Sequence, residues 1–216
     1  PASCDLAPDG ETYNPKEEIS SGQTSLGLKD ARISPVFWIY SLSLAVHALF
    51  GTALTFHVVA IFSEVGLSKE VAFSYFIPVA IFSTSANPLA SWLVDSSSLK
   101  PFLILMLGSF ILGSFGFIFL DAAWGYWALA LGFGVGGGLW GVISNLAFIR
   151  FFGPSHVGEV SGFSTSISVF ASALGPFVFS AAVDIFGSYG AAAQTCLLLL
   201  LVLLVAAVVI PQKELS

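Results

Sequence analysis

Charged residues are scarce in this sequence, and their scarcity excludes most classes of soluble protein. Asp, Glu, Lys and Arg together make up 9% of the 216 residues, whereas soluble domains carry about a quarter. Hydrophobic residues make up 56%, and the mean hydropathy is +0.91. We therefore predict an integral membrane protein, whose partner along most of its surface is the lipid bilayer.

Cysteine is also scarce, which excludes a disulfide framework. The two cysteines, Cys4 and Cys196, lie far apart and match no metal-binding spacing. We expect no metal, no cofactor and no nucleic-acid partner. A serine protease is not indicated either, because Ser164 lies in G162-F-S-T165 and no histidine follows His156. We expect no enzymatic activity.

Six long apolar runs are present, each close to the roughly 20 residues that a helix needs to cross a bilayer. None of them alternates like a strand, and a lipid-exposed backbone must satisfy its own hydrogen bonds. The runs predict helices at residues 36–62, 71–94, 102–120, 126–149, 160–183 and 191–210. The predicted fold is an all-α membrane protein with a six-helix transmembrane domain over residues 35–211.

The two ends of the chain differ from the apolar runs. Residues 1–34 are rich in acidic residues, Gly, Ser and Pro, which is typical of a disordered tail or linker. Residues 212–216 form a second, short tail. The N-terminal segment has neither an initiating Met nor the apolar core of a signal peptide, so we expect the chain to be part of a longer protein.

The basic residues predict the orientation in the membrane. Lys and Arg in short loops stay on the cytoplasmic side. With six crossings both termini share one side, where six of the seven basic residues fall, and only Lys69 falls on the other. We therefore expect a plasma (inner) membrane protein with both termini in the cytoplasm. The basic residues on that side are Lys16, Lys29, Arg32, Lys100, Arg150 and Lys213.

The segment R150-F-F-G-P-S-H-V-G-E-V-S-G162 separates the fourth and fifth predicted helices. Gly153 and Pro154 should end the fourth helix, because proline cannot continue a helix and glycine adopts unusual dihedral angles. Glu159 then falls in the first turn of the fifth helix, where a carboxylate favours the helix dipole. This segment is either a well-anchored turn or part of a conformational switch.

The second and fifth predicted helices end in similar ways, N87-P-L-A-S-W-L-V-D95 and G175-P-F-V-F-S-A-A-V-D184. If the six helices form two groups of three, the two groups enter the membrane from opposite sides, because three is odd. Inverted three-helix repeats are typical of secondary transporters.

The segment S91-W-L-V-D95-S-S-S-L-K100 resembles a degenerate form of the G-x-x-x-D-R-x-G-R loop of the major facilitator superfamily. Asp95 and Lys100 are kept, while Ser91 and Ser96 replace the usual glycine and arginine. The F151-F-G153 segment with Gly158 and Gly162, the A173-L-G-P-F to Y189 segment and the L54-T-F-H57 segment are similar to bacterial relatives of monocarboxylate and oxalate/formate transporters. The resemblance spans residues 33–210.

This resemblance implies the C-terminal six-helix half of a twelve-helix transporter, with a missing N-terminal six-helix half as its partner. Residues 1–34 would then be the cytoplasmic linker. In that family the first, second, fourth and fifth helices of each half line a central cavity. The fifth helix carries a face of Ser161, Thr165, Ser168 and Ser172, and the fourth has overlapping G-x-x-x-G spacings at Gly134, Gly138, Gly137 and Gly141. Pore lining and helix packing both explain the hydroxyl face, while the glycines favour packing.

Larger polar groups within the predicted helices are the candidates for a substrate or proton pathway. Histidine can take up a proton near neutral pH, and an ionisable residue in the membrane indicates function. His57 is favoured over His47 because it matches the family's T-F-H pattern; the alternative for each histidine is a neutral ring that makes a hydrogen bond between helices. The candidates are His47, His57, Tyr75, Asn87, Trp140, Ser144, Asn145, Thr165 and Ser168, with Asp95, Lys100, Arg150 and Glu159 as conformational loop residues.

The resemblance implies a secondary active transporter of a small-molecule substrate, such as a monocarboxylate, that works by alternating access. The monocarboxylate transporters carry an Arg and an Asp within the second helix of this half, and this chain has neither before Asp95. An anionic substrate would therefore find its charge partner in the missing half or in a protonated histidine. The alternative is a self-contained six-helix protein that dimerises into a channel or transporter.

Overall fold

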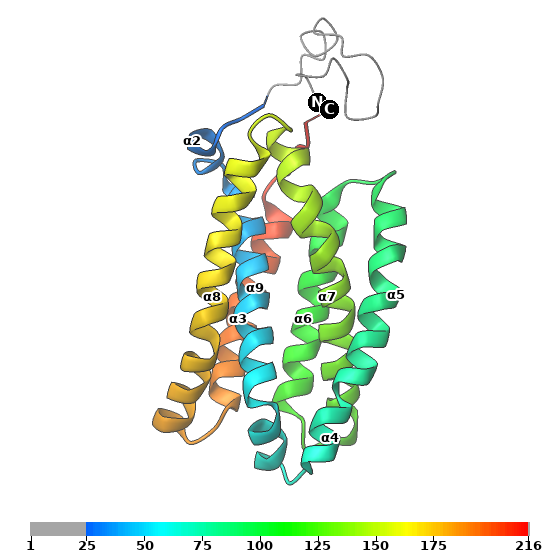
Figure 1. Cartoon of the computed structure of the whole chain (residues 1–216), viewed down its shortest axis with the longest axis vertical. Helices are drawn as coiled ribbons and strands as arrows, with labels where there is room; N and C mark the ends of the chain where they lie inside the picture. Colours follow the sequence, from blue (N-terminus) through cyan, green and yellow to red (C-terminus); the bar gives the residue numbers. More distant parts are fainter. Residues whose placement is uncertain (1–24, 216) are drawn as a thin grey trace, which may run out of the picture.

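All regular structure in the described part of the chain, residues 25–215 of the computed structural model, is helical. Figure 1 shows the long helices packed side by side along one axis. Six helical segments are long and apolar enough to cross a membrane, with α4 and α5 together forming one of them, and the predicted six-helix membrane fold is confirmed. The elements are α2 (Leu28–Ala31), α3 (Pro35–Glu64), α4 (Lys69–Ser74), α5 (Phe76–Val94), α6 (Leu99–Ile118), α7 (Ala123–Phe152), α8 (Val157–Phe186) and α9 (Gly190–Val209).

The helices α3, α7 and α8 are longer than the apolar runs indicate. Each has 30 residues, which corresponds to about 45 Å against a hydrocarbon core of about 30 Å. The extra turns continue until the sequence forces an end. Helix α7 stops before Gly153, which has a φ of 83°, and α8 stops before Gly187, which has a φ of 75°.

The second crossing is interrupted near its start. Helix α4 ends at Ser74 and α5 begins at Phe76. Pro78 has no backbone N–H, so the carbonyl of Ser74 loses its usual donor four residues later, and the helix is locally broken. The apolar pattern predicted one continuous helix here because it does not register the missing donor.

The described residues begin with a segment that packs on the bundle. The backbone N–H of Leu26 donates to the carbonyl of Phe152 at 2.8 Å, and Arg32 lies 5.2 Å from the centre of the Phe163 ring. Residues 25–34 thus include helix α2 rather than only the disordered segment expected there, because these contacts compensate for its low apolar content. Most of that expected tail, residues 1–24, lies outside the described residues.

The packing of the helices follows an inverted repeat of α3 to α6 and α7 to α9. Helix α3 packs along α8, and α5 packs along α7, which are equivalent pairs under that repeat. The residue before each internal proline meets a carbonyl of the partner helix. The side-chain amide of Asn87 donates to the carbonyl of Gly138 at 3.0 Å, and the Cα of Gly175 lies so close to the carbonyl of Leu49 that a Cβ would overlap it.

Glycines allow α7 to approach its neighbours closely. A Cβ on Gly134 or Gly138 would lie 2.5 or 2.8 Å from a side-chain carbon of α5, and a Cβ on Gly132 would overlap the backbone of α6. A Cβ on Gly116 of α6 would overlap the backbone N of Leu129 in α7 and lie 2.7 Å from the carbonyl oxygen of Gly125. The glycine spacing therefore serves helix packing, as expected.

We expect Gly116→Ala to destabilise the bundle, because the added methyl group would push α6 away from the α7 backbone. Overpacking of this kind costs about 1–3 kcal/mol or more. Gly108→Ala is the matched control, since Gly108 lies on the same helix with nothing within 4 Å of an added Cβ. Thermal unfolding of the two purified variants in detergent should show a lower midpoint for Gly116→Ala only. Equal midpoints would contradict the close approach of α6 and α7.

Candidate functional site

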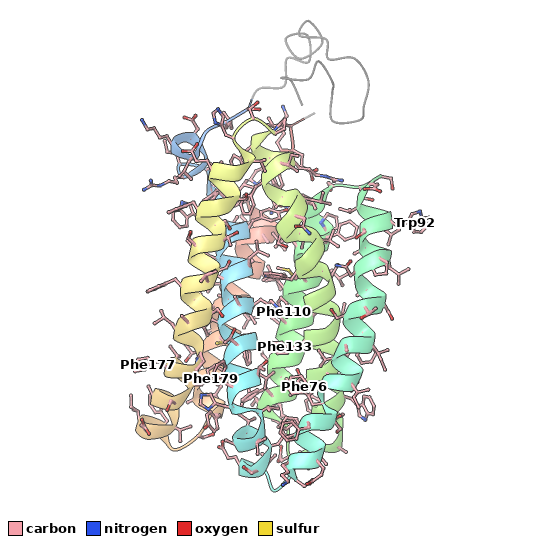
Figure 2. The ribbon with its side chains drawn as sticks, viewed as in Figure 1. Phe76, Trp92, Phe110, Phe133, Phe177 and Phe179 are labelled. Atoms are coloured by element: carbon pink, nitrogen blue, oxygen red, sulfur yellow. The ribbon has the colours of Figure 1, made fainter. Side chains whose placement is uncertain are left out.

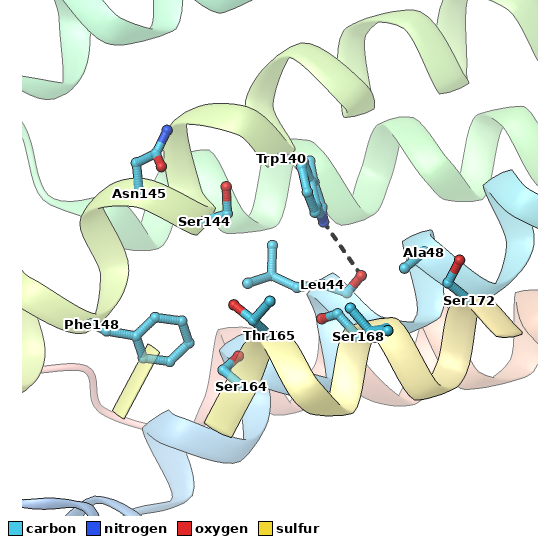
Figure 3. Close-up of a pocket in the computed structure, with 11 residues that line it drawn as sticks. Leu44, Ala48, Trp140, Ser144, Asn145, Phe148, Ser164, Thr165, Ser168 and Ser172 are labelled. Carbon is cyan, nitrogen blue, oxygen red and sulfur yellow. Dashed lines mark hydrogen bonds between the residues drawn. The ribbon is translucent and has the colours of Figure 1, made fainter. Parts of the chain in front are cut away.

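Two cavities lie beside α3 and α7 and are partly open at the surface of the bundle, where Thr55, Asn145 and Thr165 are exposed. The first has a volume of about 380 Å³ and lies nearer to the end that holds both described chain ends, so we name it the proximal cavity. Figure 3 shows it between α3, α7 and α8. It is lined by Leu44, Ala48, Trp140, Ser144, Asn145, Phe148, Ser164, Thr165, Ser168, Val169 and Ser172.

The second cavity lies nearer to the opposite end of the bundle, and we name it the distal cavity. It has a volume of about 390 Å³ and lies between α3, α7 and the start of the second crossing. Its lining is more aromatic than that of the proximal cavity. The lining residues are His47, Ala48, Gly51, Thr52, Leu54, Thr55, Tyr75, Phe76, Val79, Ser83, Phe133, Gly137 and Trp140.

The polar groups of both cavities are neutral hydrogen-bonding groups and one histidine. Among residues 25–215, no Asp, Glu, Lys or Arg lines either cavity. Hydroxyl, amide and indole groups can donate to a carboxylate or hydroxyl of a bound solute without contributing a net charge. A hydrogen bond joins the linings of the two cavities: the hydroxyl oxygens of Thr52, on the distal lining, and Ser172, on the proximal lining, are 2.7 Å apart.

Seven of the nine residues predicted for a substrate or proton pathway line these cavities. The proximal cavity contains Trp140, Ser144, Asn145, Thr165 and Ser168, and the distal cavity contains His47, Tyr75 and also Trp140. Asn87 lines neither cavity and instead ties α5 to α7 through its bond to Gly138.

His57 also lines neither cavity. Its Nε2 atom lies 3.1 Å from the carbonyl oxygen of Pro176, and its Nδ1 atom lies 3.3 Å from the hydroxyl of Tyr189. The ring thus links α3 to α8 and to the loop before α9. Pro176 and Tyr189 are separated along the chain from His57 by more than a hundred residues, so the sequence pattern gave no indication of these partners.

His47 sits among aromatic rings at the distal cavity. Its ring stacks on Phe110 with a centroid distance of 4.3 Å and an interplanar angle of 12°, and Trp140 lies 5.7 Å away. Figure 2 shows Phe110 and Phe133 in the interior of the bundle. The buried Nδ1 atom of His47 has no hydrogen-bond partner among the described residues, which is uncommon for a buried polar atom.

Several cavity residues were missed by the sequence analysis. Ser164, Thr52, Thr55 and Ser83 all line a cavity. Ser172, which was named on the hydroxyl face of the fifth predicted helix, lines the proximal cavity. Ser164 is almost fully buried, and its hydroxyl has no partner among residues 25–215. The signal was present for α3, because Ala48, Thr52 and Thr55 are spaced at i, i+4 and i+7, which places them on one side of the helix.

The predicted conformational loop residues gather at the end that holds the described chain ends. The Arg150 guanidinium donates to the carbonyls of Val94 and Ser97, each at 2.8 Å, and lies 3.4 Å from the carboxylate of Glu214. The other oxygen of Glu214 accepts from the backbone N–H of Leu99 at the start of α6. Arg150 therefore joins α7 to the α5–α6 loop and to the C-terminal segment.

The other loop candidates have separate partners. The ammonium of Lys100 donates to the carbonyls of Val208 and Ile210 at the end of α9. Asp95 lines a polar hollow of about 430 Å³ beside Arg150. Glu159 is in the first turn of α8, and one of its oxygens lies 3.9 Å from Nδ1 of His156.

Comparison with known proteins places this arrangement in a family. The family model described as Major Facilitator Superfamily matches residues 6–176, well over half of the chain. No curated protein matches the chain. Members of this superfamily are multi-pass membrane transporters of small solutes rather than enzymes, in agreement with six apolar helices around polar cavities. The chain therefore belongs to the Major Facilitator Superfamily, a family of secondary transporters of small solutes.

Proposed function

We propose that this chain is one six-helix unit of an alternating-access transporter for a small organic anion such as a monocarboxylate. The observation that carries this proposal is the pair of cavities beside α3 and α7, which are lined by hydroxyl, amide, indole and imidazole groups. Volumes near 400 Å³ are at the small end of the usual range for ligand sites, about 300–1,000 Å³. A solute of a few carbon atoms fits this size.

The exposure of α5 and α8 supports a second six-helix unit as the partner. The spans that contain α5 and α8 have the smallest shares of buried residues, 11% and 17%, whereas 56% of the residues are buried in the span of α7. Figure 2 shows Trp92 of α5 and Phe177 of α8 pointing away from the bundle. Asn145 and Thr165 of the proximal cavity are also exposed, and polar groups of this kind are costly against lipid. A covering unit, either another part of the protein or a second copy, would remove that cost.

The anion and the coupled proton meet in the distal cavity under this proposal. A charge at the middle of the membrane costs about 2.5–3.5 kcal/mol on insertion scales, and a bound carboxylate would offset the charge of a protonated His47. Tyr75 is the other titratable group on this cavity's lining within the described chain. We assign the proton to His47 rather than His57, because His47 lines the cavity and its Nδ1 atom has no partner.

Orientation gives the first test. We expect a cysteine at Ser98, in the loop before α6, to be protected from a membrane-impermeant maleimide added to intact cells. A cysteine at Ser188, in the loop before α9, should be labelled, because the two loops lie at opposite ends of the bundle. Labelling both after membrane permeabilisation controls for reactivity. Labelling of Ser98→Cys in intact cells would contradict cytoplasmic termini.

Transport by the isolated chain gives the second test. The purified 216-residue chain in proteoliposomes should show no saturable uptake of radiolabelled lactate or acetate, because alternating access moves two six-helix units against each other around a central site. The complete natural protein that contains these residues should take up at least one of them. Saturable uptake by the isolated chain would favour a dimer of two copies.

The histidines give the third test, in the complete protein. His47→Gln should flatten the pH dependence of uptake, because glutamine keeps a hydrogen-bonding head but cannot titrate. His57→Gln should keep the pH profile, since its partners are a backbone carbonyl and a hydroxyl. Uptake is measured at matched amounts of reconstituted protein. The opposite result, a flat profile for His57→Gln only, would return the proton to His57.

A further inference from the structure

The two cavities share two lining residues, Ala48 and Trp140. Along α7, which runs towards the described chain ends, the distal lining stops at Trp140 and the proximal lining begins there. Along α3, which runs the other way, Ala48 likewise belongs to both linings. The cavities therefore follow one another along the membrane normal, with Trp140 at their junction.

The indole of Trp140 reaches from α7 to α3 at this junction. Its Nε1 atom donates to the carbonyl oxygen of Leu44 at 3.3 Å, the contact drawn as a dashed line in Figure 3. The centroid of its ring also lies 5.7 Å from the centroid of the His47 ring. The hydrogen bond fixes the ring between the two helices, where it contributes to the wall of each cavity.

Trp140 has no aromatic counterpart at the equivalent position of the other repeat. The contacts of Asn87 with Gly138 and of Gly175 with Leu49 pair residue 138 of α7 with residue 49 of α3. Two residues further along each helix, Trp140 is the equivalent of Gly51. A Cβ on Gly51 would meet only the ring of His47, at 3.7 Å. The junction thus has a single large ring with open space at the equivalent position.

We propose that Trp140 is the specificity-determining barrier between the two cavities, and that a solute crosses the membrane only when the indole leaves the carbonyl of Leu44. This inference rests on the proposed transport function and identifies the residue that blocks passage of the solute. A solute that passes must fit one cavity at a time, so Trp140 sets the upper size of the substrate. Replacing it by alanine would join the cavities into one longer space.

Cysteine labelling tests the barrier without any substrate. In the complete natural protein, with Cys4, Cys196 and any other native cysteine replaced, single cysteines are placed at Thr55 in the distal cavity or Thr165 in the proximal cavity. The charged, membrane-impermeant reagent MTSET is added to proteoliposomes from the distal side. With Trp140 present, Thr55→Cys should react at least about tenfold faster than Thr165→Cys. The second unit of the complete protein would cover the exposed side of both cavities, and packed side chains around Trp140 would then leave few gaps larger than a water molecule, so about tenfold is the smallest ratio expected.

Trp140→Ala should reduce that ratio several-fold by accelerating the reaction at Thr165→Cys. Trp140→Phe, which keeps a ring but loses the N–H donor, should reduce it less and decides the matter if the alanine variant does not fold. Trp127→Ala is the control, since Trp127 lies on the same helix with an exposed side chain, and it should leave the ratio unchanged. Equal rates with Trp140 present, or a ratio that neither Trp140 variant changes, would overturn the proposal. Absence of monocarboxylate uptake would refute the proposed substrate and leave this result standing.

Discussion

The inability of lipid to form hydrogen bonds is the constraint on which the rest of this structure depends. Each backbone group within the membrane must be satisfied by the protein, which requires helices. Each polar side chain must likewise find a partner or face a cavity. Asn87 and His57 meet this requirement by bonding to carbonyls of neighbouring helices. The hydroxyl groups of α8 meet it in part by lining the proximal cavity, so the same constraint that stabilises the bundle also places the candidate site.

The sequence predicts the features that depend on neighbours along the chain. The six crossings, the end of α7 at Gly153 and the close approach at the glycines of α7 all follow from local composition and spacing. The break at Tyr75 was also encoded locally, through Pro78, but an apolar pattern does not register a missing hydrogen-bond donor. The helix bounds shifted for a similar reason, because a helix continues beyond its apolar residues until a cap stops it.

The candidate site was harder to predict, because it depends on which helix faces meet. The sequence analysis favoured His57 over His47, because His57 matches the family's T-F-H pattern. Ten residues separate them, close to three helical turns, and their surroundings differ entirely: His47 lines a cavity, and His57 bonds to Pro176 and Tyr189. Those partners come from α8 and the loop after it, so no local pattern distinguishes the two roles. Ser164 was missed in the same way, since its burial depends on how α8 packs along α3.

The departures from the inverted repeat explain why the two cavities are not equivalent. Pairing residue 138 with residue 49 makes Gly136 the equivalent of His47, just as Gly51 is the equivalent of Trp140. A Cβ on Gly136 would overlap the ring of Phe110, and that ring stacks on His47. Gly136 of α7 thus leaves room for the Phe110 ring, which stacks on His47 of α3. If the two repeats had the same side chains, the two cavities would be identical. Because Gly136 and Gly51 stand at the equivalent positions, His47 lines only the distal cavity and Trp140 supplies the single large ring at the junction. A histidine can exchange a proton and an indole cannot, and the imidazole of the two linings lies on the distal side of Trp140.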